Sequence, residues 1–371
     1  METVRSWWKT HQTTPNNDYD HFQLVCRLRK EVLCPYVVVA ETDGRPLAIL
    51  IARMEQTHFV PAVGYFKPIK ISAKVLTVIH EALIGEIDEK IGNELIRHLW
   101  TVLCSREIDA IAFCHVPDNS PLLKALMTNI PHWWRERKPN WSVHWGMDIP
   151  DEQGFILKNM KSKHRSGLRS KEKKLIAAFQ GKVAWRWITR FDDIPYLCSC
   201  IEEVASRTYQ RGLGVGFVND EEQRRRFELF SKRGLLRMHL LVTLGKIRAY
   251  RIGIIYRSVF HGFGIGYDPE LRKYRPGTLS FLHTMDNLVR EGVKKVDFGL
   301  GDAHYKQRFG DRSWREGTVH LFAPSVKGLI LKQALGSFDA LDRAARHLLQ
   351  KTGGLNFIKT GWRRRVTPNK G

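Results

Sequence analysis

The chain has 371 residues with a formal net charge of +22, and 43% of its residues are hydrophobic and 26% charged. At roughly 150 residues per domain, this length and composition predict an ordinary globular protein of two domains, which excludes a disordered chain. The excess of positive charge favours a polyanionic partner, such as a nucleic acid, an anionic membrane surface or a phosphorylated ligand.

The N-terminal residues 1–20 contain no apolar segment of the kind found in signal peptides. The longest aliphatic stretch, residues 235–256, is interrupted by Lys246, Arg248 and Arg251 and does not predict a membrane span. None of the six cysteines forms a C-x-x-C pair and no His/Cys cluster has zinc spacing, so we expect no metal site. These features predict a protein of the reducing cytoplasm, with any membrane contact peripheral at the inner face of the membrane.

The first half of the chain reads as a mixture of strands and helices. Residues 36–54 predict a hairpin, because an Asp-Gly turn separates two apolar runs. Residues 86–103 have apolar positions at helical spacing, and residues 108–116 are typical of a buried strand. A short helix is expected over residues 122–130.

The second half repeats this order of a strand meander that leads into a strand, helix, strand crossover. We expect helices over 202–211, 220–232 and 277–291, three strands within 235–268, a strand that begins at residue 294, and another over 314–321. The repetition predicts a mixed-sheet α/β (α+β) fold in both halves. A helix over 329–349 and a basic tail, residues 361–371, follow.

A strongly basic segment precedes the second half. Residues 158–174 contain eight Lys or Arg residues and one acidic residue, Glu172. Two interpretations stay open: a helix that presents cations to phosphates, or a solvated face at a domain boundary. A second basic element follows Asp268, where a short cationic loop ends at Pro276, Gly277 and Thr278. The free amides of the helix that begins there are suited to an anion.

The stretch KKVDFGLGDAHYKQRFG, residues 294–310, begins as a strand, breaks on glycines and then becomes polar and basic. With the preceding element it resembles the BioF2-like, or cellulose-biosynthesis-protein-like, branch of the GNAT acyltransferases. The resemblance covers about residues 155–321, and residues 1–150 match only as a degenerate partner domain. The matching positions are Tyr267-Asp268, Tyr274, Pro276-Gly277-Thr278, Asp297-Phe298-Gly299, Gly301-Asp302, Tyr305-Lys306 and Phe309-Gly310, with Arg165, Leu168 and Arg169 in the entry helix.

The resemblance implies tandem GNAT-like domains: a degenerate domain over 1–150, an acyltransferase domain over 151–325, and a C-terminal helix with a basic tail over 326–371. An acyl thioester, such as acetyl-CoA, is expected between two splayed strands, residues 260–268 and 294–301. The residues expected to bind this co-substrate are Tyr267, Arg272, Lys273, Arg275, Gly277 and Thr278.

The loop departs from the usual Arg/Gln-x-x-Gly-x-Gly/Ala pattern, because Tyr274 and Leu279 stand at its first and last positions. This departure leaves the donor open. Residues 305–310 are close to the Phe-Lys-x-x-Phe-Gly motif of the Fem-type relatives, which use aminoacyl-tRNA.

The chemistry of acyl transfer suggests roles for the polar residues of the second strand and its exit. Asp297 or Asp302 can orient or deprotonate the acceptor, Tyr305 can protonate the leaving group, and Lys306 can neutralise an oxyanion or a phosphate. His304 is a further candidate base. Structural roles stay open for Asp297, Tyr305 and His304. The residues expected to bind the acceptor are Arg165, Arg169 and His304.

The predicted function is N- or O-acyl transfer from acyl-CoA to an amino or hydroxyl group of an anionic envelope or exopolysaccharide precursor, or of a lipid. One alternative is aminoacyl-tRNA-dependent transfer, in which tRNA is a partner. Another is a non-catalytic protein that binds nucleic acid or an anionic membrane surface, for which Trp185-Arg186-Trp187 is a faint stacking signal. The sequence does not predict an oligomeric state.

Overall fold

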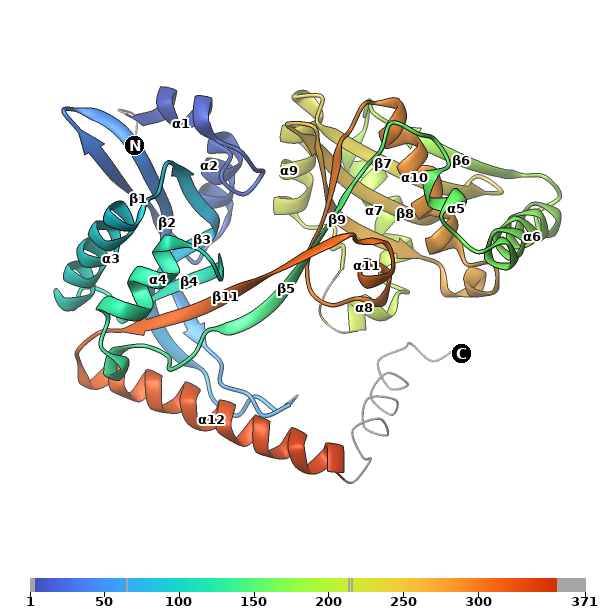
Figure 1. The fold of residues 1–371 in the computed structure, drawn as a ribbon. Helices are drawn as coiled ribbons and strands as arrows, with labels where there is room; N and C mark the ends of the chain where they lie inside the picture. The colour runs from blue at the N-terminus through green and yellow to red at the C-terminus, as the bar shows by residue number, and fades with distance from the viewer. Residues whose placement is uncertain (1–3, 65, 213, 215, 352–371) are drawn as a thin grey trace. The chain divides into compact units, whose positions relative to one another are not determined.

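The computed structural model describes residues 4–64, 66–212, 214 and 216–351, and these form two compact units (Figure 1). Of the described residues, unit 1 contains 4–144, 300–302 and 313–351, and unit 2 contains 145–299 and 303–312. The chain thus enters unit 2 at residue 145, passes through unit 1 over residues 300–302, and returns to unit 1 at residue 313. The predicted domain borders at residues 150 and 325 stay predictions.

Unit 1 is built on strands in the order β1-β2-β3-β4-β11. Only the β3–β4 pair is parallel, and α3 makes the crossover between these strands. The elements are α1 (Arg5–His11), α2 (Tyr19–Leu28), β1 (Val32–Thr42), β2 (Arg45–Phe59), β3 (Ile71–Gly85), α3 (Glu89–Cys104), β4 (Ala110–Pro117), α4 (Pro121–Asn129), η2 (His132–Trp134), β11 (Arg312–Phe322) and α12 (Val326–Lys351). The strand β5 (Asn140–Asp148) carries the chain from unit 1 into unit 2.

Local signals in the sequence account for the limits of these elements. Asp43 and Gly44 both have positive φ, as a two-residue hairpin turn requires between β1 and β2. The Asp88 side chain accepts a hydrogen bond from the Ile91 amide and so caps the start of α3. Alternating strand residues pack on both faces of the sheet, and Leu331 of α12 packs with the smaller of the two clusters.

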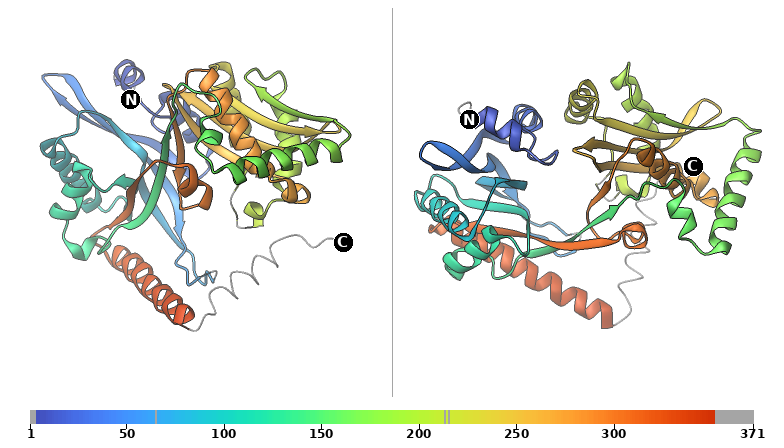
Figure 2. Two further views of the ribbon diagram at one scale, coloured as in Figure 1. Left: turned by 45° about the vertical axis from the view of Figure 1, so that its right-hand side comes forward. Right: turned by 45° about the horizontal axis from the view of Figure 1, so that its top comes forward.

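Unit 2 is built on strands in the order β10-β9-β8-β7-β6. Its elements are α5 (Phe155–Lys158), α6 (Ser162–Ala178), β6 (Val183–Ile188), α7 (Ile194–Ala205), α8 (Tyr209–Gly212), α9 (Glu221–Lys232), β7 (Leu236–Thr243), β8 (Lys246–Tyr256), β9 (Val259–Tyr267), η3 (Pro269–Tyr274), α10 (Pro276–Arg290), β10 (Lys295–Leu300) and α11 (His304–Phe309). One face packs against α7 and α9 and the other against α10 (Figure 2). The four strands β6 to β9 are antiparallel, and β9–β10 is parallel with α10 as its crossover.

Both units therefore show the predicted meander followed by a strand, helix, strand crossover, and the prediction of a mixed α/β fold is confirmed. Most predicted elements are present, but the helix expected over 202–211 is wrong, because α7 ends at Ala205 and the short α8 follows. The sequence analysis did not predict α1, α2 or α11. The predicted basic tail lies outside the described residues, and among those described no helix is long and apolar enough to cross a membrane.

Close packing at Gly253 offers a test of this fold. A Cβ atom at Gly253 would lie 2.4 Å from the Phe260 ring and 2.5 Å from the His261 carbonyl oxygen, so β9 would have to move. We expect Gly253→Ala to lower the free energy of unfolding by about 1–3 kcal/mol, measured by urea denaturation.

The matched control is Gly264→Ala, because its Cβ would approach Tyr250 only to 3.8 Å. This variant is expected to unfold within about 0.5 kcal/mol of the unchanged protein. Equal stabilities of the two variants would contradict the described packing of β8 on β9.

Candidate functional site

The parallel pairing of β9 with β10 stops after three residue pairs. The last pair is His261 with Asp297, and beyond it Gly262–Tyr267 and Phe298–Leu300 have no ladder to each other in the described structure. Gly262, Gly264 and Gly266 alternate along this part of β9, which pairs with β8 but not with β10. The Tyr250 ring occupies the space beside Gly266, whereas a Cβ atom added at Gly262 or Gly264 would have no neighbour closer than 3.8 Å. A ligand can therefore approach the β9 backbone closely where the two strands diverge.

A histidine–aspartate pair stands at this point of divergence. His261 Nδ1 lies 3.1 Å from Asp297 Oδ2, and Asp297 Oδ1 accepts a hydrogen bond of 2.6 Å from the Gly299 amide. Both carboxylate oxygens of Asp297 are thus engaged, which fits an orienting role better than proton abstraction. Asp297 thereby fixes the tautomer and direction of the His261 imidazole, a group that is chemically able to accept a proton.

Lys306 of α11 lies beside the glycine turn at the end of β10. Its buried side chain donates a hydrogen bond of 3.0 Å to the Gly299 carbonyl oxygen. Burial lowers the pKa of Lys306, while the nearby Asp297 carboxylate raises it. The ammonium group consequently holds the glycine turn after β10 and adds positive charge beside Asp297.

A second buried cation lies on the α10 face of the sheet. Arg251 of β8 pairs in register with Ile265, in the part of β9 that has no ladder with β10. Its guanidinium carbon lies 5.2 Å from the Phe281 ring centroid and 6.0 Å from that of Tyr305. Burial lowers the pKa of Arg251, while the charge interaction with Tyr305 raises it. No carboxylate pairs with Arg251 among the described residues, and a buried cation without an anion is typical of a functional site.

The predicted phosphate loop is a short 3-10 helix, η3, that ends at the N-terminus of α10. Arg275, with φ +56°, caps α10 in the left-handed conformation, and Arg272, Lys273 and Arg275 are all exposed. The loop is anchored by the buried Asp268, which accepts a hydrogen bond from one arginine and forms an ion pair with each of two. These partners are Arg207 Nη1 at 2.8 Å and Arg248 Nη2 at 3.1 Å.

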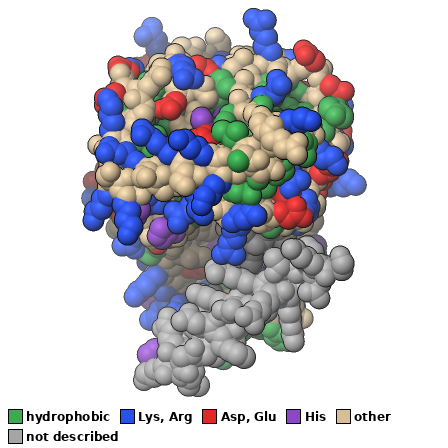
Figure 3. Space-filling model, turned by 90° about the vertical axis from the view of Figure 1, so that its right-hand side faces the viewer, with side chains coloured by type: hydrophobic (Ala, Val, Ile, Leu, Met, Phe, Trp, Pro, Cys, Tyr) green, Lys and Arg blue, Asp and Glu red, His purple; other side chains and the backbone are tan. Residues whose placement is uncertain are grey.

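The basic helix α6 lies against this loop. Its buried Leu168 packs with Leu279 of α10, and its buried Leu175 packs with Leu271 of η3. The opposite face of α6 and Lys158 of α5 line an open groove with cationic side chains and serines; those of α6 include Ser162, Arg165, Ser166, Arg169, Ser170 and Lys173. Basic side chains outnumber acidic ones on this side of the molecule (Figure 3).

A stack of aromatic and polar side chains fixes α6 to the sheet. Glu172 of α6 accepts a hydrogen bond of 2.8 Å from His283 of α10, and this bond lowers the pKa of Glu172 against the effect of burial. The rings of Trp185, His239 and His283 stack on one another at 4.6–5.8 Å between centroids. The single acidic residue of the basic segment thus has a structural role, and Trp185 is a packing residue.

The structure brings some of the predicted site residues together. Asp297 and Lys306 share the exit of β10, whereas Tyr305 packs against Phe298 and lies near Arg251. His304 is the exposed first residue of α11, and Asp302 is exposed in the turn before it.

The predicted binding residues form two groups. Arg165 and Arg169 lie on the grooved face of α6, and the donor group lies at η3 and the start of α10. In that group the Tyr267 ring would contact a Cβ on Gly277 at 3.4 Å, and Thr278 donates its amide to the Arg275 carbonyl oxygen.

The sequence analysis missed His261 and Arg251. The available signal was weak: His261 is an isolated histidine in β9, and Arg251 is one of three basic residues in β8. Only the strand register shows that His261 faces Asp297 and that Arg251 faces the divergent part of β9.

Comparisons with known proteins agree with this geometry. Residues 162–307 match a family model described as an acetyltransferase (GNAT) domain. FemX is 10% identical with a TM-score of 0.52, over 86% of this chain and 95% of FemX. A conserved protein of unknown function from Bacteroides thetaiotaomicron is 11% identical with a TM-score of 0.52, over 86% of this chain and 96% of that protein. No curated protein matches. The chain thus contains a GNAT acetyltransferase domain and has a GNAT-like fold.

His239, one of the two histidines in the ring stack beside α6, predicts a pH dependence of the stability of the fold. Burial, with added repulsion from His283 and Arg251, lowers the pKa of His239 to about 3, whereas an unfolded histidine titrates near 6.5. Between these two values the unfolded chain binds one more proton than the folded one, so stability is complete above pH 6.5 and falls as the pH falls towards 3.

The measurement is urea denaturation from pH 7 to pH 4. His239→Gln is expected to remove a dependence of about 1.4 kcal/mol per pH unit. His98→Gln, which changes an exposed residue of α3, is the control. A His239→Gln profile parallel to that of the unchanged protein would show that His239 is not buried in its neutral form.

Proposed function

We propose that unit 2 is an acyltransferase that binds an acyl-CoA donor where β9 and β10 diverge. The observation that carries this proposal is the parallel pair that ends at His261 and Asp297 and opens onto the glycines of β9. The match of residues 162–307 to the GNAT domain model supports the same reaction class. Assignment to the BioF2-like branch is part of this proposal.

The donor would lie with its acyl-pantetheine arm along the unpaired backbone of β9. Its diphosphate would meet the N-terminus of α10, where the Gly277 amide is the second of the helix and has no partner inside the helix. Arg272, Lys273 and Arg275 add three exposed cations at the same end. Charge and amide direction thus favour an anion there, although the loop lacks the usual glycine-rich pattern.

The reaction would proceed by direct transfer. His261 accepts the proton of the attacking amine or hydroxyl group, while Asp297 holds its Nδ1–H. The nucleophile forms a bond to the acyl carbon, and the carbon–sulfur bond breaks. Tyr305 supplies a proton to the leaving thiolate and regains it from solvent. Arg251, buried behind β9, favours negative charge on the acyl oxygen.

The acceptor is proposed to be anionic, because the α6 face that borders the site carries Arg165, Arg169 and Lys173 with few acidic neighbours. An amino- or hydroxyl-bearing envelope or exopolysaccharide precursor, or a lipid at an anionic membrane surface, has this chemistry. The same face also favours a second candidate donor, aminoacyl-tRNA, because its cations match a phosphate backbone. Calorimetry with acetyl-CoA and then with charged tRNA separates the two, and binding of neither favours a binding protein without catalysis.

The first kinetic prediction concerns the base. We expect His261→Ala to lower kcat by about 10²–10⁴-fold at saturating donor with little change in the KM for acetyl-CoA, because His261 acts on the acceptor proton. Asp297→Asn should lower kcat less, since it changes only the orientation and tautomer of His261. The assay is release of free CoA thiol. His98→Ala serves as the control, and turnover in His261→Ala equal to that of the control would exclude the proposed base.

The second kinetic prediction concerns the donor loop. The double variant R272A/K273A removes two cations from η3 without touching the divergent strands. It should raise the KM for acetyl-CoA and leave kcat at saturation unchanged, because the diphosphate is bound equally in the ground and transition states. Raised ionic strength should produce a similar rise in the unchanged protein. An unaltered KM would place the diphosphate elsewhere.

A further inference from the structure

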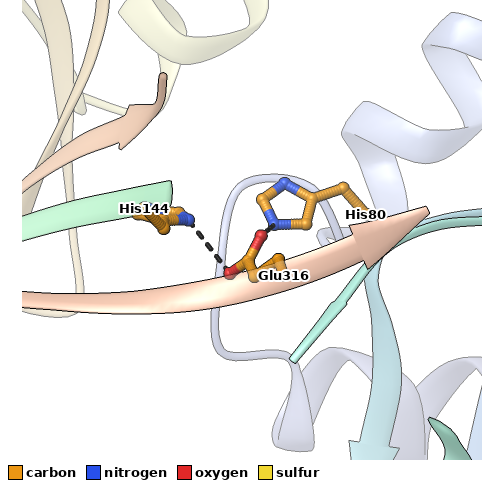
Figure 4. Close-up of side chains that lie close together, drawn as sticks. All are labelled: His80, His144 and Glu316. Carbon is orange, nitrogen blue, oxygen red and sulfur yellow. Dashed lines mark hydrogen bonds and ion pairs between the residues drawn. The ribbon is translucent and has the colours of Figure 1, made fainter. Parts of the chain in front are cut away.

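Unit 1 gathers three polar side chains at one buried point. His80 comes from β3, His144 from β5 and Glu316 from β11 (Figure 4). His80 Nε2 lies 2.9 Å from Glu316 Oε2, and His144 Nδ1 lies 3.0 Å from Glu316 Oε1. One candidate ligand atom from each residue lies within 4.8 Å of the other two. The side chains of His144 and Glu316 are only 2% and 4% exposed, so water competes little for these atoms.

Hydrogen bonding does not account for all of these atoms. His80 Nε2 and Glu316 Oε2 are close but not aligned for a hydrogen bond, and neither atom has a hydrogen-bond partner among the described residues. Glu316 Oε2 therefore has an ion-pair contact with His80 but no hydrogen bond among the described residues, and a bound metal cation would satisfy both atoms.

Irregular backbone in β3 and β4 carries His80 and His115, the histidines of these two strands, at the cluster. Residues 79–82 of β3 form a bulge opposite Ile51, because Ala52 pairs with Val78 and Leu50 with Leu83. Within this bulge Glu81 has φ +58°. His115 of β4 has φ +53° and lies at a second register shift. Bulges and left-handed residues of this kind redirect side chains and are concentrated at functional sites.

The cluster stands where the parallel pair of unit 1 ends. The last pair of β3 and β4 is Val78 with Phe113, and His80 and His115 each lie two residues beyond it. In unit 2 the corresponding parallel pair of β9 and β10 opens onto the proposed donor site. The same topological position in unit 1 therefore holds imidazoles and a carboxylate in place of glycines.

The neighbours of the cluster resemble the supporting groups of a metal site. Trp314 stacks on His144 with 4.3 Å between ring centroids, and its Nε1–H donates a hydrogen bond of 2.7 Å to Glu316 Oε1. It thereby orients two of the three side chains, as groups around metal ligands commonly do. His115 also faces the cluster, with its ring centroid 5.5 Å from that of His80 and its buried Nδ1 without a hydrogen-bond partner among the described residues.

From this geometry we propose that unit 1 binds one divalent transition-metal ion, Zn²⁺ by ligand type, through His80, His144 and Glu316. Two imidazoles and a carboxylate suit Zn²⁺ and its first-row neighbours, and three protein ligands leave a position for water or for His115. The sequence analysis predicted no metal site because it considered short spacings only. His144 and Glu316 are 172 positions apart and meet only through the sheet.

The test uses the full-length chain without a polyhistidine tag, stripped with a chelator and titrated with Co²⁺, followed by displacement with Zn²⁺. We expect one equivalent of Co²⁺ to give visible ligand-field absorption that Zn²⁺ abolishes, and Zn²⁺ to raise the thermal unfolding temperature. Glu316→Gln and His144→Ala should weaken binding by at least about 100-fold. Binding should also weaken below about pH 6, since the imidazoles must be neutral to bind.

His320→Ala is the matched control, because His320 is a half-buried histidine of the same unit that pairs with Glu136 at 3.1 Å. It should bind Co²⁺ like the unchanged protein. If Glu316→Gln fails to fold by circular dichroism, His80→Gln replaces it, since His80 is the most exposed of the three ligands. Absence of a ligand-field spectrum in the unchanged protein, or equal affinity in the folded ligand variants, would overturn the proposal.

Discussion

Both units of this chain depend on a parallel strand pair that ends early. Beyond the last pair, backbone amides and carbonyls of two neighbouring strands face each other without a ladder, and such groups must be satisfied by something else. In unit 2 the strands diverge beside His261 and Asp297, and glycines alternate along β9 from that point. In unit 1 bulged backbone fills it with polar side chains. One topological feature thus yields two chemically different sites.

Buried charge distinguishes these sites from the surrounding core. Arg251 and Lys306 in unit 2 are buried cations whose pKa values are lowered by burial, and Glu316 in unit 1 is a buried anion. Burying such groups costs stability unless a partner of opposite charge arrives. In the two proposals made above, an acyl oxygen would supply negative charge beside Arg251, and a metal ion would bind Glu316 together with His80 and His144. The large positive charge of the outer surface acts at longer range by attracting anionic ligands.

Much of the fold follows from local sequence. The Asp-Gly hairpin, the amphipathic α3, and the Pro-Gly start of α10 are encoded by neighbouring residues, and all three are present. The error over 202–211 arose because the apolar positions of α7 begin before that window, after the Asp193 cap. The helix α11 is too short for a periodic pattern, so the sequence there reads as a turn.

The sites themselves were less predictable. Asp297 and Lys306 were found because they lie within one short stretch, whereas the partner of Asp297, His261, is on another strand and is identified only by register. The cluster of unit 1 was harder still to predict from the sequence, because β3, β5 and β11 supply one side chain each. Pairing between distant strands is set by the whole sheet, and no local pattern of residues reports it.

Hydrogen exchange of the backbone amides tests the central claim most directly. The amides of Gly262–Tyr267 and Phe298–Leu300 lack a ladder to each other in the described structure and should exchange faster than those of the paired segment Val259–His261. Addition of acetyl-CoA should slow exchange at Gly262–Tyr267 and at the first turn of α10, and leave β1 to β4 unchanged. Protection that appears elsewhere, with these segments unaffected, would contradict a donor site between β9 and β10.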